Sequence, residues 1–407
     1  FCFGATMAKP YPYFVSLDEA RDICHNNKIS LPTEEVSIDD SLNRIIASNV
    51  VAKVNDPPFD NSAMDGFAVI FSETKSTPVE LSIIGVSNAG SDNLPELSSG
   101  QAMKIMTGAP IPKGADSIIP IEKCVIKGEK VTLHEQSKPH FIRKQGENFT
   151  INSVLFEPGE VLTPEKISLC AAAGVDKLTV YQKLKVAIIP TGDELKPLNE
   201  ELGYGEIYES NSYGLSALIT SLGHEATRFS TVVDNLDTLR ETLNIAAKNH
   251  DLIITSGGVS MGDRDFVRII MQNEGDINFW RVKMRPGSPP IFGKWSNTPI
   301  FGLPGNPVSS HVVFRVIVMD WLMSLTNSIN PRNKIIQATL DDDVKVVEGF
   351  TTFRRVELFY HQGKNLARLK GHQGSGNVAG IAMSDGLTIL GPNDSGKRGD
   401  NCQIMLF

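Results

Sequence analysis

Two glycine-rich segments in the second half of the chain have the composition of loops that bind phosphate. Thr255–Gly262 and Gly302–Pro307 each lie between an apolar, strand-like stretch and a stretch with helical periodicity. Glycines let backbone N–H groups approach a phosphate closely, and the following helix adds the positive end of its dipole. A tight strand-to-helix turn would explain the first segment equally well. The candidate ligand contacts are Ser256, Gly257, Gly258, Ser260, Pro304, Gly305, Asn306 and Pro307.

Acidic residues gather around the same loops. Glu194 and Asp265 each follow a glycine turn at the end of a predicted strand. Because Mg²⁺ prefers oxygen ligands and shares those of phosphates, we expect both carboxylates to bind it. Asp234 and Asp263 belong to the same group. For these two, a helix N-cap and a first-turn acid that complements the helix dipole are the alternative interpretations.

Three cations alternate with apolar residues just before a rigid Pro-Gly-Ser-Pro segment. They are Arg281, Lys283 and Arg285, and in a strand this spacing places them on one face. An edge strand whose cations discourage aggregation is the alternative interpretation. Their position beside glycine-rich loops, in a chain of net charge −8, favours an anion-binding face.

The elements that must position these residues alternate between strand and helix. Strands are predicted at Leu184–Ile189, Arg228–Val233, Leu252–Thr255 and Ile300–Leu303, and helices at Tyr213–Leu222, Leu236–Lys248, Asp265–Gln272 and Val308–Leu325. This alternation is typical of a doubly wound α/β domain with a mostly parallel sheet, which we place at residues 182–326. Such sheets bind ligands beyond the carboxyl ends of their strands, where the loops and acids above would meet.

Two further regions consist of short predicted strands separated by turns that contain glycine. Ala63–Leu133 is expected to form a compact β domain, and Lys334–Phe407 a small barrel or sandwich. Helices are expected to start at Ser16 and at Thr163-Pro164, and a further helix is expected over Asp39–Ala47.

Composition excludes several classes of function. The acidic charge argues against a nucleic-acid partner, which needs a basic surface. No apolar run reaches the roughly 18 residues of a membrane span, so we expect no membrane partner. The five cysteines include no CxxC pair and fit reduced thiols in the cytoplasm. The eight histidines lack the spacing of metal ligands.

Seven short motifs occur in a fixed order over nearly the whole chain. They are Phe59–Ala68, Met106–Pro110, Arg143–Glu147, Thr191–Leu195, Ser256–Gly262, Gly302–Pro307 and Gly371–Ser375. In this order they resemble the molybdopterin molybdenumtransferase family of the MoeA type, which includes the C-terminal domain of gephyrin. The resemblance covers about Tyr13 to Met405.

The resemblance implies a fold of four domains and an assembly. A discontinuous linker domain would comprise residues 10–50 and 142–181, and a β-rich, lemon-shaped domain residues 51–141. The α/β, molybdopterin-binding-like domain would span residues 182–326, and a C-terminal β-barrel residues 333–407. The family works as an elongated homodimer whose cleft is shared between subunits.

The resemblance also implies the reaction. Adenylylated molybdopterin is hydrolysed at its pyrophosphate with the help of Mg²⁺, molybdate is placed on the dithiolene, and AMP is released. A contact with the molybdopterin adenylyltransferase that makes this substrate is a further expected partnership. Adenylylation of molybdopterin itself and a gephyrin-like scaffold are the alternative functions.

Site residues are implied where the motifs match. Catalytic roles fall to Asp65, Thr107, Glu194 and Asp265, and Mg²⁺ binding to Glu194, Asp234 and Asp265. Substrate contacts include Pro304, Pro307, Arg355 and Ser375 besides the glycine loops. The family's two cleft lysines correspond to Arg281 and Arg285, and a third to Ser288. An arginine fork and a lysine point charge bind oxyanions differently.

Overall fold

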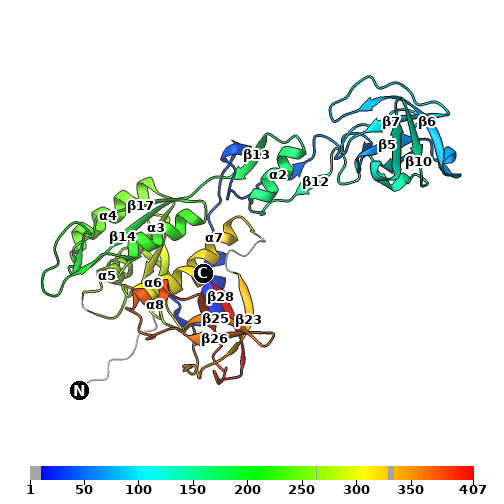
Figure 1. Ribbon diagram of the computed structural model, residues 1–407. Helices are drawn as coiled ribbons and strands as arrows, with labels where there is room; N and C mark the ends of the chain where they lie inside the picture. The colour runs from blue at the N-terminus through cyan, green and yellow to red at the C-terminus, as the bar shows by residue number, and fades with distance from the viewer. Residues whose placement is uncertain (1–10, 263, 329–333) are drawn as a thin grey trace, which may run out of the picture.

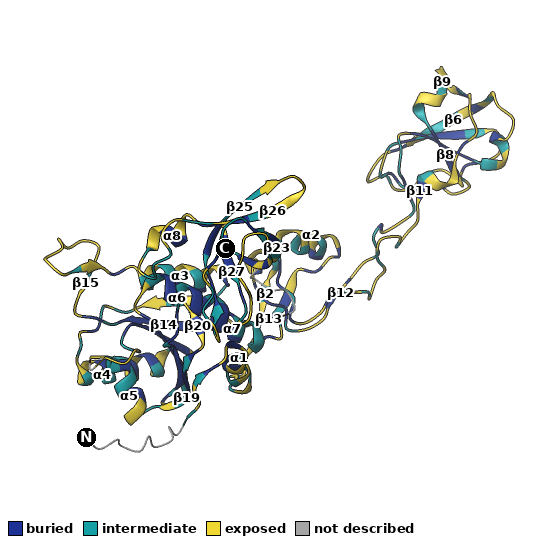
Figure 2. Ribbon diagram, turned by 90° about the horizontal axis from the view of Figure 1, so that it is seen from below, coloured by how far each residue is buried: buried dark blue, intermediate teal, exposed yellow. Residues whose placement is uncertain are grey.

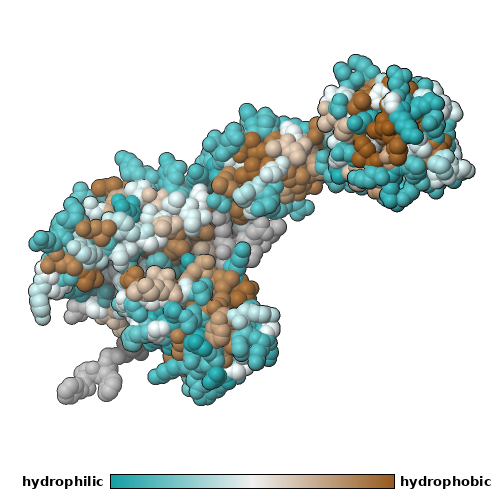
Figure 3. Space-filling model, in the orientation of Figure 1, coloured by the Kyte–Doolittle hydropathy of each residue, from teal (hydrophilic) through white to brown (hydrophobic). Residues whose placement is uncertain are grey.

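The computed structural model describes residues 11–262, 264–328 and 334–407. Asp263, one of the candidate acids, lies outside this part of the chain. The molecule is elongated: a large body holds the α/β domain and a C-terminal barrel, and a small β domain lies at the far end of a narrow connection (Figures 1 and 3).

A seven-stranded mixed sheet forms the centre of the large body. Its order is β1 (Tyr13–Val15), β19 (Asp276–Val282), β21 (Ile291–Trp295), β22 (Thr298–Leu303), β18 (Leu252–Ser256), β14 (Lys185–Pro190) and β17 (Glu225–Arg228). All neighbours are parallel except β19–β21 and β21–β22. The predicted doubly wound, mostly parallel domain is therefore confirmed, with two antiparallel pairings that the sequence analysis did not anticipate.

Helices cover both faces of this sheet. Strand β14 shows why, because its side chains alternate: Val186 and Ile188 belong to one buried cluster, and Ala187 and Ile189 to the other. The first cluster contains residues of α1 (Leu17–Asn26), α3 (Asn211–Ser221), α6 (Pro307–Val313) and α7 (Met319–Leu325). The second contains residues of α4 (Leu236–Asn249) and α5 (Phe266–Asn273). Burial on both faces explains the continuous apolar strands.

The helical segment Pro307–Leu325 is long and apolar enough to cross a membrane. It continues from α6 to α7 through a π-helical turn at Phe314–Val318. Within the fold, 67% of its most apolar window is buried, against the sheet and α1. The segment thus serves as the central helix of the α/β core, and the polar residues inside it explain why the sequence showed no uninterrupted apolar run.

The β domain is a six-stranded sheet built from one continuous stretch of chain. Its order is β8 (Ser117–Pro120), β5 (Gly66–Val69), β7 (Gln101–Ile105), β6 (Val79–Ser87), β10 (Lys130–Leu133) and β9 (Cys124–Lys127). Two apolar clusters, one on each side of β5, form its core. Figure 2 shows that only a thin pair of chain segments joins it to the rest.

The connection to the β domain is made by two segments far apart in sequence. They pair as β2 (Thr33–Ser37) with β13 (Lys177–Tyr181), β3 (Val50–Val51) with β12 (Val154–Phe156), and β4 (Asn61–Ser62) with β11 (Ile142–Arg143). Helix α2 (Pro164–Ala172) begins at the Thr163 cap, as predicted. One apolar cluster holds residues from both segments, including Ile46 and Val180.

The C-terminal region closes into a five-stranded barrel. Its order is β23 (Ile335–Leu340), β26 (Lys364–Leu369), β25 (Arg355–His361), β27 (Gly386–Ile389) and β28 (Asn401–Leu406). A short strand ahead of β25, β24 (Thr351–Thr352), pairs with β20 (Met284–Arg285) of the α/β domain. This pairing fixes the barrel against the segment that carries the cations.

Three sequence-based expectations differ from the structure. The helix over Asp39–Ala47 is wrong: only Ile38–Asp40 is helical, and Ile46 instead bridges to Val180 across the discontinuous connection. The strand predicted at Arg228–Val233 lies earlier in the chain, at Glu225–Arg228. Residues 13–26, which the family resemblance placed with the linker, pack into the α/β core through β1 and α1.

Candidate functional site

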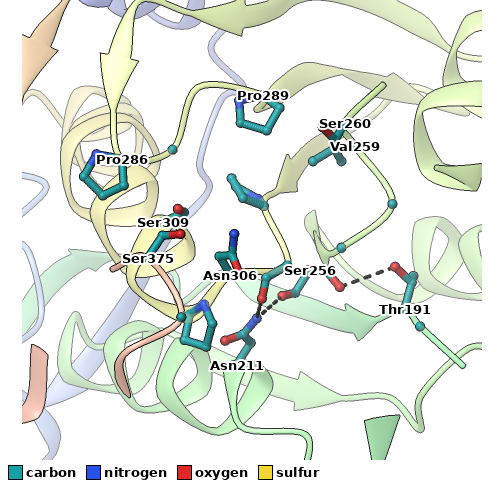
Figure 4. Close-up of a pocket in the computed structure, with 18 of the residues that line it drawn as sticks. Thr191, Asn211, Ser256, Val259, Ser260, Pro286, Pro289, Asn306, Ser309 and Ser375 are labelled. Atoms are coloured by element: carbon teal, nitrogen blue, oxygen red, sulfur yellow. Dashed lines mark hydrogen bonds between the residues drawn. The ribbon is translucent and has the colours of Figure 1, made fainter. Parts of the chain in front are cut away.

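A large open cavity, of about 990 Å³, lies at the carboxyl ends of the parallel strands. The two glycine-rich loops follow the neighbouring strands β18 and β22 and lie side by side in its wall (Figure 4). The cavity wall contains thirteen of the candidate residues, namely Glu194, Asp234, Ser256, Gly257, Gly258, Ser260, Asp265, Arg285, Pro304, Gly305, Asn306, Pro307 and Ser375. The cavity therefore lies at the sheet edge where ligands of parallel sheets are expected to bind.

The first loop needs its glycines for two separate reasons. Gly257 and Gly258 have φ of +105° and +67°, in the left-handed region that other residues rarely adopt. A Cβ on Gly257 would also lie 2.6 Å from the carbonyl oxygen of Thr191. The loop consequently packs directly on the end of β14 and turns its backbone toward the cavity.

Asn211, which was not among the residues predicted from the sequence, joins the two loops. Its amide nitrogen donates to Ser256 Oγ (2.8 Å) and to the Gly305 carbonyl (2.7 Å), as Figure 4 shows. Its amide oxygen is buried and has no hydrogen-bond partner among the described residues. The only signal in the sequence was an asparagine at the start of a predicted helix, where capping gives a sufficient explanation.

The second loop connects the α/β domain to the barrel. Asn306 precedes α6 without a side-chain capping bond, so its amide remains available at the helix N-terminus. The Val308 N–H donates to the Ser375 carbonyl at 3.0 Å. Ser375 is therefore brought to the cavity by a backbone contact between the two domains.

Three other carboxylates lie close to Asp234 at one side of the cavity. Partial burial, followed by the charges of Asp193, Glu194 and Asp265, raises the pKa of Asp234. Asp193 accepts a hydrogen bond from the Asp234 N–H (3.0 Å), and Asp265 accepts one from the Gly262 N–H (2.5 Å). These acids form an electronegative wall beside the first loop.

Positive side chains also line the cavity. Arg264, Arg285 and Arg354 contribute to the cavity lining. Arg281 does not: its guanidinium lies over the rings of Tyr13 and Phe14 and donates to Tyr13 Oη (3.2 Å). The backbone of Arg281 has φ of +70°, so the simple strand alternation expected for the three cations is interrupted there.

Ser288, at the position of the third family lysine, also lines the cavity. It is buried, and its hydroxyl donates to the Val282 carbonyl at 2.9 Å. It supplies no charge, so the arginines carry the positive charge at this side of the cavity.

Family comparison covers almost the whole described chain. Residues 15–174 match the MoeA N-terminal region (domains I and II), residues 187–324 a probable molybdopterin binding domain, and residues 337–407 the MoeA C-terminal region (domain IV). A molybdopterin molybdenumtransferase of Haemophilus influenzae is 34% identical over 92% of this chain and 94% of the relative.

The chain belongs to the MoeA family of molybdopterin molybdenumtransferases. A Bacillus subtilis molybdopterin molybdenumtransferase is also 34% identical, over 97% of this chain and 94% of its own. The crystal structure of a molybdopterin biosynthesis MoeA protein from Pyrococcus horikoshii OT3 superposes with a TM-score of 0.83 at 27% identity, covering 97% of this chain and all of that one.

Two residues implied by the MoeA resemblance lie far from the cavity of their own chain. Asp65 and Thr107 are in the β domain, at the opposite end of the molecule (Figure 1). Asp65 accepts hydrogen bonds from the backbone N–H (2.6 Å) and the hydroxyl (2.8 Å) of Thr107, and these bonds lower its pKa. The pair is therefore an exposed carboxylate that is kept ionised.

Arg355 of the MoeA-type barrel lies beneath the cavity rather than in its wall. Its guanidinium is buried and donates to the carbonyl groups of His372 (2.6 Å) and Gly374 (3.2 Å). It thereby holds the loop that carries Ser375. The neighbouring Arg354 faces the cavity instead, a difference that adjacent arginines in sequence could not reveal.

Proposed function

We propose that this member of the MoeA family inserts molybdate into adenylylated molybdopterin in its α/β cavity and releases AMP. The observation that carries the proposal is the convergence of two glycine-rich loops, three arginines and the acids Glu194, Asp234 and Asp265 on one cavity. A substrate with phosphate groups and a second, tetrahedral anion would use both kinds of charge. The matches to the MoeA N- and C-terminal regions support insertion over the preceding adenylylation step.

The glycine loops would bind the phosphate end of the substrate. Their backbone N–H groups and the N-terminus of α6 favour negative charge. The amide oxygen of Asn211 accepts only, so it would meet an N–H or O–H group of the ligand rather than a phosphate oxygen. The rigid prolines at 304 and 307 hold this arrangement before binding.

Glu194, Asp234 and Asp265 would hold Mg²⁺ in this proposal. Burial and the charges of the neighbouring acids raise the pKa of Asp234, which fits a site whose charge is balanced by a bound cation. Among the described residues no three acidic, histidine or cysteine side chains stand ready around one point, so ligand oxygens must complete the coordination. When bound, Mg²⁺ would act as a Lewis acid toward a pyrophosphate oxygen.

Arg285 and Arg354 would attract molybdate, a dianion, and Ser375 would donate a hydroxyl hydrogen bond to it. Arg264 lies close to the acids, and its charge partly opposes the rise in the pKa of Asp234. In this proposal it would bind phosphate. Arg281 would serve the anion from the rim.

The distant Asp65–Thr107 pair supports a homodimer with a shared cleft. A single chain cannot bring this pair to its own cavity in the observed arrangement, whereas a partner's β domain could cover it. The cysteines in the described chain are all free, in keeping with a reducing cytoplasm. Contact with the adenylyltransferase that supplies the substrate belongs to the same proposal.

The decisive experiment measures AMP release from adenylylated molybdopterin as a function of Mg²⁺ concentration. Glu194→Ala and Asp265→Ala should each lower the rate by about 100-fold or more and raise the Mg²⁺ requirement, as expected for loss of a group that stabilises the transition state. Full Mg²⁺-dependent release by both variants would refute the metal assignment.

Two further assays separate the alternatives. Consumption of ATP with metal-free molybdopterin would identify an adenylyltransferase. A scaffold would fail to restore molybdoenzyme activity in a cofactor-deficient strain, whereas the proposed enzyme should restore it.

A further inference from the structure

We propose that two phenylalanines, Phe14 and Phe350, are positioning residues that hold the anion-binding arginines Arg281 and Arg285. The inference rests on the proposed function, because it assumes that these arginines serve molybdate. The four side chains form a continuous ladder in the order Arg281, Phe14, Phe350, Arg285, which we call the aromatic ladder.

The first half of the aromatic ladder lies on the edge of the large sheet. The guanidinium carbon of Arg281 is 4.7 Å from the centre of the Phe14 ring. Phe14 and Arg281 occupy the same level of the parallel pair β1–β19, between the partners Tyr13/Trp280 and Val15/Val282. Both have positive φ, +59° and +70°. Two rare conformations at one level turn both side chains out of the regular strand alternation and toward each other.

The second half joins the C-terminal region to the cavity. The rings of Phe14 and Phe350 meet edge to face with centres 5.6 Å apart. The Arg285 guanidinium lies over the Phe350 ring at 5.0 Å, and Arg285 also lines the cavity. Phe350 thus contacts both Phe14 and the cavity arginine.

Backbone hydrogen bonds fix the Phe350 end of the ladder. The Thr351 N–H donates to the Lys283 carbonyl (3.0 Å), and the Phe353 N–H donates to the Arg285 carbonyl (2.7 Å). At the other end, the Lys283 N–H donates to the Val15 carbonyl (2.7 Å). The ladder therefore ties three segments from distant parts of the chain into one unit.

The chemistry of the guanidinium explains what the ladder achieves. A guanidinium that stacks on a ring presents its N–H groups at its edge, where an oxyanion can bind them. Among the described residues, neither Arg281 nor Arg285 forms an ion pair with a carboxylate, whereas Arg368 on the barrel pairs with Asp341. Aromatic contacts orient Arg281 and Arg285 without neutralising them, as an anion site requires.

The test compares the variants Phe350→Leu and Phe14→Leu with the parent protein. Calorimetry measures the Kd of molybdate, and AMP release during molybdate insertion gives the molybdate KM and kcat. We expect the molybdate Kd and KM to rise about two- to six-fold, the loss expected for one exposed cation–π contact, with kcat nearly unchanged. Phe359→Leu is the matched control, because Phe359 lies 4.7 Å from Arg368 on the barrel and away from the cavity; its Kd and KM should not change.

A double-mutant cycle separates positioning from general packing. In an Arg285→Lys background, Phe350→Leu should have a much smaller effect on molybdate binding, since the planar stacking partner is already gone. Equal effects in both backgrounds, or an effect on kcat alone, would overturn the positioning role.

The outcomes also distinguish this inference from the proposed function. If Arg285→Ala leaves molybdate binding unchanged, the anion assignment itself is wrong. If Arg285→Ala weakens binding but both leucine variants bind like the parent protein, only the aromatic ladder is refuted.

Discussion

Asp234 shows how one carboxylate can be unfavourable for the fold and useful for the site. Burial and three neighbouring acids raise its pKa, so the folded protein binds a proton there more tightly than the unfolded chain does. Ionised Asp234 therefore costs stability above its unfolded pKa, and the cost disappears as pH falls below that value. Functional sites commonly carry such a stability cost.

We predict that Asp234→Asn raises the melting temperature at pH 7 to 8 and that this gain shrinks toward acidic pH. The variant should also lose the additional stabilisation that Mg²⁺ gives the parent protein. Scanning calorimetry at several pH values, with and without Mg²⁺, measures both effects. A variant that is less stable than the parent at pH 8 would contradict this account of the acidic wall.

Asn211 carries a second prediction at the residue scale. Asn211→Ala removes the hydrogen bonds to Ser256 and Gly305, which should lower the free energy of unfolding by about 1–3 kcal/mol and raise the KM for the pterin substrate. Denaturant titration and kinetics measure the two quantities. Asn365→Ala is a suitable control, since its amide makes only one long, exposed contact, and it should change neither.

At the scale of elements, the first glycine-rich loop can bind its ligand only if its backbone keeps the positive φ angles. We predict that Gly257→Ala abolishes AMP release while the protein still folds, because the new Cβ would both strain the backbone at φ of +105° and collide with Thr191. Gly128→Ala is the control for a positive φ without a collision: the φ of Gly128 is +59°, but the space around it is open. It should cost only about 1 kcal/mol of stability and leave activity intact, as activity and circular dichroism would show.

Elements whose signals are local could be predicted from the sequence. The Thr163 cap with Pro164 at the first turn placed α2 correctly, and the apolar strands β14 and β18 identified the sheet edge at which the cavity lies. The helix expected over Asp39–Ala47 failed because Ile45 and Ile46 are used in bridges to Val161 and Val180. That choice is made by chain segments more than a hundred residues away, and no local pattern contains it.

The candidate site could also be predicted only in part from the sequence. Loops that follow parallel strands must gather at one edge, so the glycine segments and their acids could be placed together. Asn211, Arg354 and the true location of Arg355 depend on how α3 and the barrel dock onto that edge. Docking is decided by packing between domains, which spacing along the chain does not encode.

At the scale of the whole molecule, the separation of Asp65 from the cavity makes a specific prediction. If each active site combines the cavity of one subunit with the β domain of the other, mixing inactive Asp65→Asn and Glu194→Gln subunits should restore activity. After random exchange about half of the dimers are mixed, and each mixed dimer has one intact site of its two. The mixture should therefore show about one quarter of the parent activity. Activity of the exchanged mixture measures this, with unmixed variants as controls; no recovery after verified subunit exchange would show that Asp65 does not complete the partner's site.

The pairing of β1 with β19 has a consequence for the order in which the chain can fold during synthesis. The six-stranded sheet of the β domain uses one uninterrupted stretch and is complete once residue 133 has left the ribosome, whereas the connection to the large body must wait for residues 177–181. Strand β1 has no partner until residues 276–282 appear, and Phe14 meets Phe350 only later still. An early, apolar strand that waits so long is a natural client for chaperones. Loss of residues 11–16 should therefore spare the β domain but leave the nascent α/β sheet with an open edge.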